Sequence, residues 1–289
     1  MRKPIVLMHV SDLHFVDDSL RLIDLVRKEG ITSKRVIGWM NYRFNRRGQF
    51  TNSIRTQLIE YLKTNDWDYL VISGDLTNLA LETEFRAARK QLEPLIEKGT
   101  VIMTSGNHDR YVKGALEPDL MAQTFSDCFP FNQEPLQGGE SHHLELGDSA
   151  VLFEIATACP RLHVSSRGRI QNDLEACEAF IQKNYSDRLK LVVGHYPAFL
   201  PENEKEGYLH RLDDRSRLQD FLKNSCTDIY LHGHIHKTWQ STPPDLTRPV
   251  CLNAAGCCRY ADGDWSGFHR VTMTGTQFEV SQIRLPVSA

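Results

Sequence analysis

The sequence lacks any apolar stretch of membrane-spanning length, and it lacks cysteines spaced as C-x-x-C. Its seven cysteines are an odd number, and the adjacent Cys257 and Cys258 suit neither a disulfide framework nor a zinc knuckle. We therefore expect reduced thiols in a cytoplasmic protein. The first apolar run ends at Val10, which is too short for a signal-peptide core and is typical of a buried strand.

An excess of charge of one sign is also missing. The chain has 34 Lys and Arg against 37 Asp and Glu, a net charge of -3, which gives no global electrostatic basis for binding nucleic acid. With 289 residues, 40% of them hydrophobic, the chain is long enough to bury a sizeable core. We expect one domain over residues 1–289 with an insertion at about 16–52, and any membrane contact to be peripheral, at the inner membrane.

Short apolar runs that end in polar residues recur along the chain and predict central strands buried on both faces. These runs are Ile5–Val10, Tyr69–Ile72, Val101–Met103, Leu191–Val193 and Ile229–Leu231. Apolar residues at helical spacing lie between these runs and predict helices at Ile54–Lys63, Glu82–Ile96 and Leu174–Asn184. Two later stretches, His142–Ile155 and Val250–Leu285, predict antiparallel strands, with turns at 261–264 and 274–275 in the second. The alternation of strands and helices predicts an α/β fold.

The polar residues that follow these strands have the chemistry of metal ligands. They are Asp12, His14, Asp75, Asn107, His195, His234 and His236. Carboxylate, amide and imidazole groups together suit Mn, Fe, Zn or Co and are too rich in nitrogen for calcium. Seven such groups are about the number that two metal ions need if one carboxylate bridges them. A pair of ions about 3.5–4 Å apart is the usual catalytic centre for nucleophilic displacement at phosphorus.

The order of these motifs resembles the calcineurin-like metallophosphoesterases. The matching motifs are Asp12-Leu13-His14, Gly74-Asp75, Gly106-Asn107-His108-Asp109, Gly194-His195 and Gly233-His234-Ile235-His236, and the resemblance covers about residues 5 to 240. It implies a two-sheet β-sandwich flanked by helices, an α/β/β/α arrangement, and a metal-dependent hydrolase of phosphate esters or anhydrides. A non-catalytic scaffold remains an alternative, although such members of the fold lack metal-site residues.

The resemblance also implies roles for the motif residues. Asp12, His14 and His236 would hold one metal ion, Asn107, His195 and His234 the other, and Asp75 would bridge them. His108 would stabilise the phosphoryl oxygens or protonate the leaving group, and Asp109 would accept a hydrogen bond that orients His108. Mn is the first expectation for both ions, with Fe, Zn or Co as alternatives.

The insertion is the strongest local deviation in composition, because no Asp or Glu occurs from Ile31 to Ile59. If it forms a helix, Val36, Ile37, Met40 and Phe44 share one face, with Trp39 at its edge. Such a cationic amphipathic segment either packs on the core or lies against a lipid surface; stacking on nucleic-acid bases is a further alternative that the net charge disfavours. The candidate substrate or membrane contacts are Arg35, Trp39, Asn41, Arg43, Arg46 and Arg47.

The insertion is similar to that of chlamydial-type enzymes that cleave the pyrophosphate of UDP-2,3-diacylglucosamine, giving lipid X and UMP in lipid A biosynthesis. This similarity implies a nucleotide-linked lipid as substrate. A cyclic-nucleotide or other phosphodiester phosphodiesterase is the alternative, and a protein phosphatase is a weaker one. We infer no protein partner from the sequence.

Overall fold

The computed structural model describes residues 3–50, 52–135, 141–162, 164–244, 246–261, 264–265 and 267–284. The five short apolar runs form strands of two mixed sheets, four of them inside a sheet and the one at Thr100–Met103 at an edge. The first sheet has the strand order β13-β12-β1-β2-β3. Its strands are β1 (Ile5–Val10), β2 (Tyr69–Ile72), β3 (Thr100–Met103), β12 (Phe268–Thr274) and β13 (Gln277–Ile283). β1, β2 and β3 are parallel, whereas β12 and β13 are antiparallel to their neighbours.

The second sheet has the order β4-β5-β6-β7-β9-β8. Its strands are β4 (His142–Leu146), β5 (Ala150–Glu154), β6 (Leu189–Val193), β7 (Ile229–His232), β8 (Trp239–Ser241) and β9 (Val250–Asn253). β5, β6, β7 and β9 are parallel, and β4 and β8 run antiparallel at the two edges. A small separate pair, β10 (Tyr260–Ala261) and β11 (Asp264–Trp265), flanks the expected turn, whose residues 262 and 263 lie outside the described chain.

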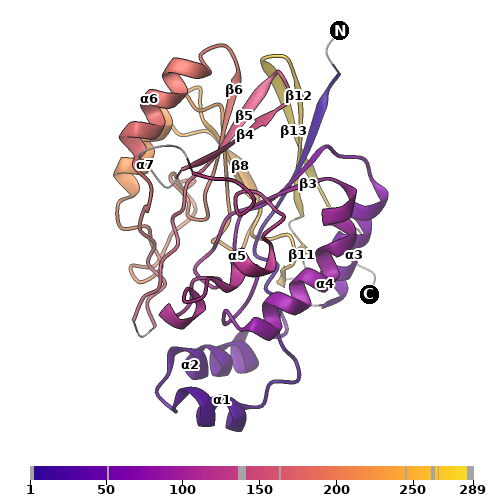
Figure 1. The fold of residues 1–289 in the computed structure, drawn as a ribbon, viewed down its shortest axis with the longest axis vertical. Coiled ribbons are helices and arrows are strands. Elements are labelled where there is room, and N and C mark those ends of the chain that lie inside the picture. Colours follow the sequence, from indigo (N-terminus) through magenta and orange to yellow (C-terminus); the bar gives the residue numbers. More distant parts are fainter. Residues whose placement is uncertain are drawn as a thin grey trace.

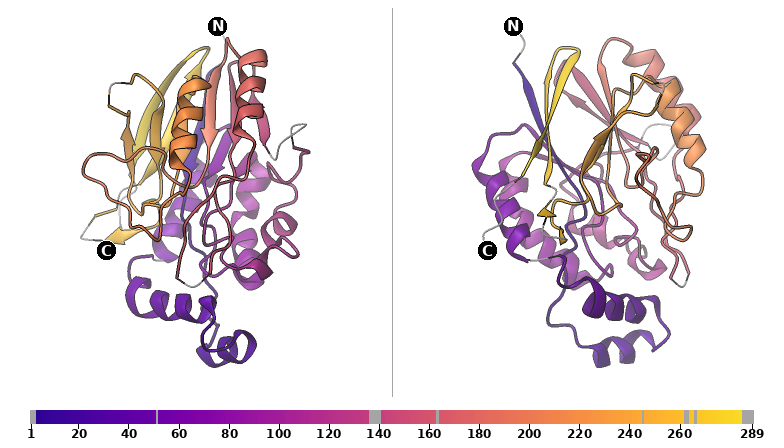
Figure 2. Two further views of the ribbon diagram at one scale, coloured as in Figure 1. Left: turned by 90° about the vertical axis from the view of Figure 1, so that its left-hand side faces the viewer. Right: turned by 180° about the vertical axis from the view of Figure 1, so that it is seen from behind.

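The sheets pack face to face, with helices on both outer faces (Figures 1 and 2). α3 (Asn52–Thr64) and α4 (Glu82–Lys98) cover the first sheet, and α6 (Leu174–Asn184) and α7 (Arg215–Asn224) cover the second. Alternate residues of β1 show why its run is continuously apolar: Leu7 packs between the sheets, whereas Met8 packs under the helices. The predicted α/β two-sheet sandwich is confirmed.

The insertion projects from one end of the sandwich (Figure 1). It contains α1 (Leu22–Glu29), α2 (Lys34–Asn41) and a π-helical turn at Tyr42–Arg46. The expected continuous apolar face is wrong, because Val36 is buried while Phe44 is 76% exposed. Phe44 lies within the wider π-helical turn, where the α-helical spacing that would align it with Val36 no longer holds.

Two short elements, a 3₁₀ turn at Lys113–Ala115 and α5 (Leu120–Thr124), follow the Gly106–Asp109 motif. Within the described residues, no helix combines the length and the apolar character needed to cross a membrane.

Candidate metal centre

The loops that follow β1, β2, β3, β6 and β7 bring all seven predicted ligands to one end of the sandwich. In the first group, the Nε2 atoms of His14 and His236 are 3.2 Å apart. Oδ1 of Asp12 lies 3.3 Å from Nε2 of His236 and 3.7 Å from Nε2 of His14. Two carboxyl ends of parallel strands therefore supply one compact set of donors, as open α/β sheets do at their ligand sites.

The second group centres on Asn107. Its Oδ1 atom is 2.8 Å from Nδ1 of His234 and 3.2 Å from Nε2 of His195. Oδ1 of Asp75 is 3.4 Å from the same nitrogen of His195. Asp75 belongs to both groups, whose His and Asp ligand atoms lie within 4.8 Å of one another in each group. The arrangement therefore places Asp75 between two potential ion positions.

The ligand atoms of the cluster are arranged to bind cations rather than to hydrogen-bond with one another. Oδ1 of Asp12 is buried and has no hydrogen-bond partner in the described part of the chain. Unsatisfied buried carboxylate oxygens are costly, so an atom of this kind needs a positive ion or a water. Together with converging ring nitrogens and one amide oxygen, it makes a set suited to borderline divalent metals.

Carbonyl oxygens fix the outer nitrogens of three of these histidines. Nδ1 of His14 lies 3.2 Å from the oxygen of Thr77, Nδ1 of His195 lies 2.8 Å from that of Ser73, and Nε2 of His234 lies 2.7 Å from that of His210. A carbonyl can only accept, so each outer nitrogen carries the proton. The lone pair of the other nitrogen is then directed into the cluster.

The backbone at the cluster is strained. Four of the ligand residues have left-handed φ angles, namely Asp12 (54°), His14 (46°), Asp75 (51°) and His234 (75°). Such conformations cost about 1–3 kcal/mol each and are concentrated at functional sites. Gly106 and Gly233 allow the chain to pass beside the ligands, because a Cβ atom would collide with Asp75 at the first position and with Ser11 and Asp12 at the second.

Charges within the cluster shift the pKa values of its buried members. Burial alone would raise the pKa of Asp75, but His195 and His108 outweigh it and hold that pKa below its ordinary value. Burial alone would lower the pKa of His195, but Asp75 raises it to about 9. The carboxylate is therefore ionised and pairs with the protonated His195 ring, and a cation between them would displace the proton on Nε2.

The prediction that Asp109 accepts a hydrogen bond from His108 is wrong. Nδ1 of His108 instead lies 2.6 Å from the oxygen of Asn78. The carboxylate of Asp109 accepts from the backbone N–H groups of Leu76, Thr77 and Gly106 and from the Thr77 hydroxyl. Asp109 therefore ties the loop after β2 to the loop after β3. Burial lowers the pKa of His108 to about 3 and raises that of Asp109 to about 6.

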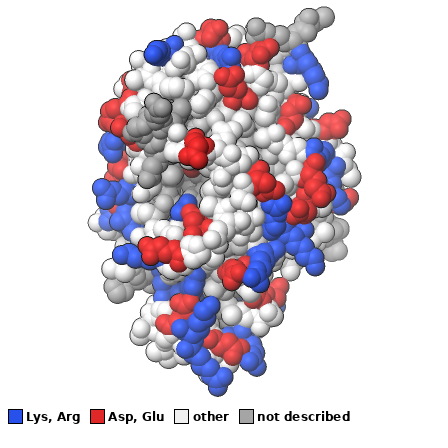
Figure 3. Space-filling view, viewed as in Figure 1, with Lys and Arg blue, Asp and Glu red and all other residues white. Residues whose placement is uncertain are grey.

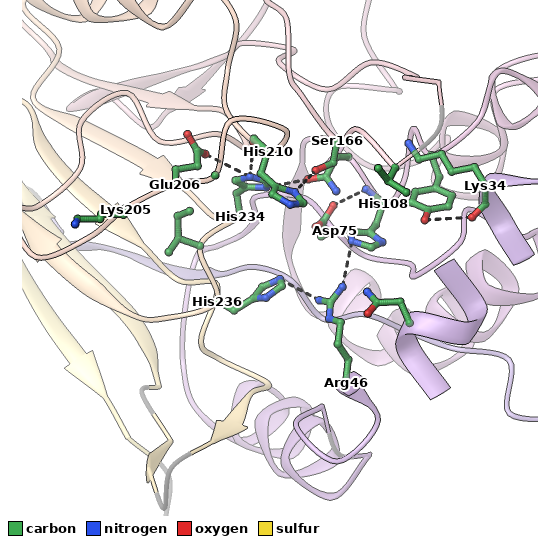
Figure 4. A pocket seen from close by; sticks show the side chains of 16 residues that line it. Lys34, Arg46, Asp75, His108, Ser166, Lys205, Glu206, His210, His234 and His236 are labelled. Atoms are coloured by element: carbon green, nitrogen blue, oxygen red, sulfur yellow. Dashed lines mark hydrogen bonds and ion pairs between the residues drawn. The ribbon is translucent and has the colours of Figure 1, made fainter. Parts of the chain in front are cut away.

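Arg46 reaches from the insertion into the cluster (Figure 4). Its Nη2 atom is 3.3 Å from Nε2 of His14 and 3.2 Å from Nε2 of His236, and its Nη1 atom is 3.4 Å from Nε2 of His108. Arg46, His108 and His236 border a cavity of about 360 Å³, which Lys34, Asn41, Tyr111, Val164, Ser166, Lys205, Glu206 and His210 also line. The predicted metal ligands Asp75, Asn107 and His234 line the same cavity.

The other insertion residues are divided between structural and exposed positions. Arg35 is buried and bonds to Glu29 and to the carbonyl oxygens of Leu79 and Ala80, so its guanidinium supports the fold rather than reaching a substrate. Trp39 packs on the core and donates to the oxygen of Leu20. Arg43 and Arg47 are exposed and line a different cavity of about 230 Å³.

Glu206, His210 and Lys34 were missed by the sequence reasoning. Glu206 lies on a long loop with no motif around it, and its Oε1 atom is 3.4 Å from Nε2 of His234. Lys34 lies in the insertion and lines the cavity, and its Nζ atom donates to the oxygens of Arg161 and Ser165. These placements depend on loops that meet from distant parts of the chain.

Comparisons with known proteins agree with this geometry. The family model for calcineurin-like phosphoesterases matches residues 5–238. Among solved structures, a dimetal phosphatase from Danio rerio aligns over 96% of this chain and 95% of its own, with TM-score 0.60 and 9% identity. Purple acid phosphatase PPD1 from yellow lupin (Lupinus luteus) aligns over 98% of this chain but only 52% of its own, with TM-score 0.59 and 14% identity.

At these identities the structural likeness shows the fold alone, and no curated protein sequence matches the chain. The family match, by contrast, covers most of the chain, including every motif that supplies a ligand. Its span ends two residues after His236, where the cluster is complete. The chain belongs to the calcineurin-like phosphoesterase family and is a metal-dependent hydrolase.

Proposed function

We propose that this protein cleaves the pyrophosphate of a nucleotide-linked lipid, UDP-2,3-diacylglucosamine, to UMP and lipid X. The observation that carries the proposal is Arg46, whose guanidinium lies within 3.4 Å of ring nitrogens of His14, His108 and His236. It stands at the junction of the ligand cluster and the adjoining cavity. A substrate with two linked phosphates gives this cation a second phosphate to bind beside the reacting one.

Asp12, His14 and His236 would hold one ion and Asn107, His195 and His234 the other, with Asp75 shared by the two groups. Two divalent ions there would supply an activated water and would neutralise the phosphoryl oxygens that gain charge. Mn is the ion to test first, because a mixed set of oxygen and imidazole donors discriminates poorly among borderline metals.

His108 and Arg46 contact the substrate. Asn78 holds the His108 ring through Nδ1, and Nε2 faces Arg46 and the cavity. Only the protonated ring carries an N–H at Nε2 as well as at Nδ1, and a bound phosphate anion favours that form; it would then bind an oxygen of the reacting phosphoryl group or protonate the leaving oxygen. The guanidinium of Arg46 offers two N–H donors in a fixed fork, which matches a phosphate better than a single ammonium does.

The cavity has the size and charge for the remainder of a diphosphate ligand. Its volume of about 360 Å³ is at the lower end of the range for small-molecule sites. Lys34 and Lys205 add positive charge to its lining, and Asn41 adds an amide. Basic and acidic side chains are interspersed over the face seen in Figure 3, a pattern that favours a small anion over a nucleic-acid backbone.

Exposed large hydrophobic residues on the segments that line this cavity support the lipid part of the proposal. Val164 lines the cavity itself, Met40, Tyr208 and Leu209 are next in sequence to lining residues, and Phe44 and Leu162 belong to the same segments. Hydrogen bonds join the three segments that carry them: Lys34 donates to the 161–165 segment, and the N–H of Ser166 donates to the oxygen of Leu209. Clustered exposed apolar residues commonly mark binding surfaces, and Arg43 and Arg47 beside Phe44 add the charge that favours anionic lipid.

The direct test is UMP release from UDP-2,3-diacylglucosamine by the purified protein with Mn, with His108→Ala as the control. We expect turnover that depends on acyl chains and is lost in the variant. Cleavage of a simple diester such as bis-p-nitrophenyl phosphate without turnover of the lipid would keep the metal assignment and refute the lipid substrate. Unchanged liposome partition after Arg43→Gln and Arg47→Gln would refute the membrane contact.

A further inference from the structure

We propose that Glu206 is a positioning residue that strengthens metal binding by His234. The inference rests on the proposed assignment of Asn107, His195 and His234 to one ion. Glu206 belongs to the loop between β6 and α7 and lies outside every motif of the sequence. Figure 4 shows its carboxylate pointing toward His234 from the side opposite the ligand cluster.

The contacts of His234 leave its outer nitrogen facing two oxygen atoms. Nδ1 points into the cluster, 2.8 Å from Oδ1 of Asn107. Nε2 donates to the carbonyl oxygen of His210 at 2.7 Å, and Oε1 of Glu206 lies 3.4 Å from the same nitrogen. The N–H group therefore has a neutral acceptor in hydrogen-bond range and a negative charge close behind it.

Glu206 is held for this role by its own surroundings. Its side chain is only 2% exposed, and Arg215 at the start of α7 binds its Oε2 atom. Its Oε1 atom is buried and makes no hydrogen bond within the described residues. The oxygen that faces His234 is thus desolvated and available, and the helix-anchored Arg215 fixes its direction.

A carboxylate behind a metal-bound imidazole raises the electron-donating power of the ring and fixes its orientation. Removal of such an outer partner commonly weakens metal affinity by about 10–100-fold. The same carboxylate lines the substrate cavity, so the loop that shapes the cavity also stabilises the metal. The other ion position, with Asp12, His14 and His236, has no contact with Glu206 in the described structure.

The test measures binding of Mn²⁺ alone by electron paramagnetic resonance of the free ion, for wild type, Glu206→Gln and Glu206→Asp. Wild type should bind two ions. Glu206→Gln should weaken the binding of one ion by about 10–100-fold and leave the binding of the other unchanged. Glu206→Asp, which keeps the charge, should restore part of the loss. Equal constants for wild type and Glu206→Gln, or no recovery in Glu206→Asp, would overturn the inference.

The matched control is Glu204→Gln on the same loop, because Glu204 pairs with the surface residue Lys237 at 2.7 Å. This variant should bind both ions like wild type; an equal loss would mean that the loop, not the Glu206 charge, is responsible. If Glu206→Gln does not fold, Arg215→Met is the alternative variant, because it removes the contact that fixes the Glu206 carboxylate toward His234. It should weaken the binding of the same ion, and unchanged binding would refute the role of Glu206. Failure of wild type to bind two ions would overturn the metal assignment itself, whereas two ions without lipid hydrolysis would overturn only the substrate.

Discussion

Replacement of Arg46 by Gln should separate substrate recognition from metal binding. The guanidinium lies at the junction of cluster and cavity, where one charge-assisted hydrogen bond to phosphate is worth about 1.5–3 kcal/mol. At about 1.4 kcal/mol for each factor of ten, kcat/KM should fall by about 10- to 150-fold. Arg46→Lys keeps the positive charge but loses the paired N–H donors of the guanidinium, so kcat/KM should fall less in this variant than in Arg46→Gln.

Metal binding should change in the opposite direction. Arg46 donates no lone pair to the ions, and its positive charge lies 3.2 Å from Nε2 of His236. Loss of that charge removes a repulsion, so Arg46→Gln should bind Mn²⁺ as tightly as wild type or more tightly. Steady-state hydrolysis of a soluble diphosphate diester, which presents the second phosphate to Arg46, and metal content measured on the same samples test both statements.

The neighbouring exposed arginine gives the control for this experiment. Arg47→Gln removes an equal charge from the same segment, but this residue lines the other cavity. Its kcat/KM for a small diester should stay within about twofold of wild type, because charges exposed to water are strongly screened. A wild-type kcat/KM in Arg46→Gln with both ions bound would refute the proposed phosphate contact.

Four further outcomes follow from the site and its supports. Asp75→Asn should abolish turnover and reduce the Mn²⁺-dependent rise in melting temperature; retained activity would contradict the bridging role. His108→Gln should lower kcat by about 10²–10⁴-fold with unchanged metal content, measured by elemental analysis. Gly106→Ala should bind less metal, because the added Cβ would clash with the carboxylate of Asp75. A variant that binds as much metal as wild type would show that the loop moves enough to relieve the clash. Burial raises the pKa of Glu84 to about 8 from 4.5. The native state therefore holds this proton more tightly than the unfolded chain. As the pH rises from about 4.5 to 8, the free energy of unfolding should fall by up to about 1.4 kcal/mol per pH unit. Glu84→Gln should flatten this pH dependence in urea titrations, and an unchanged slope would refute the assignment to Glu84.

The sequence predicts the sheets and the ligand cluster well because both depend on local patterns. Asp12 and Asp75 directly follow apolar runs, and parallel strands bring their carboxyl ends to one edge. The left-handed φ angles of these residues were not predictable, since only a few per cent of non-glycine residues adopt them, even though Asp and His do so more often than most.

The residues around the cluster depend on contacts that no periodicity encodes. Arg46 enters the site because a π-helical turn changes the direction of the insertion after Asn41. Asp109 binds backbone groups of the loop after β2, which the Asn-His-Asp order alone does not indicate. Glu206 reaches His234 from a loop about 28 residues earlier in the chain, and neither spacing nor composition distinguishes it from Glu204.

The strained backbone at Asp12, His14, Asp75 and His234 has a consequence for how such a protein changes in evolution. Glycine occupies left-handed conformations without penalty, so a substitution to glycine at one of these positions relieves strain while it removes a ligand. In the metal-free protein, each loss of a ligand would then recover part of the strain. The metal centre is held in place by selection for hydrolysis and by the stability that bound metal adds, and a lineage that no longer needed the reaction would keep only the second reason.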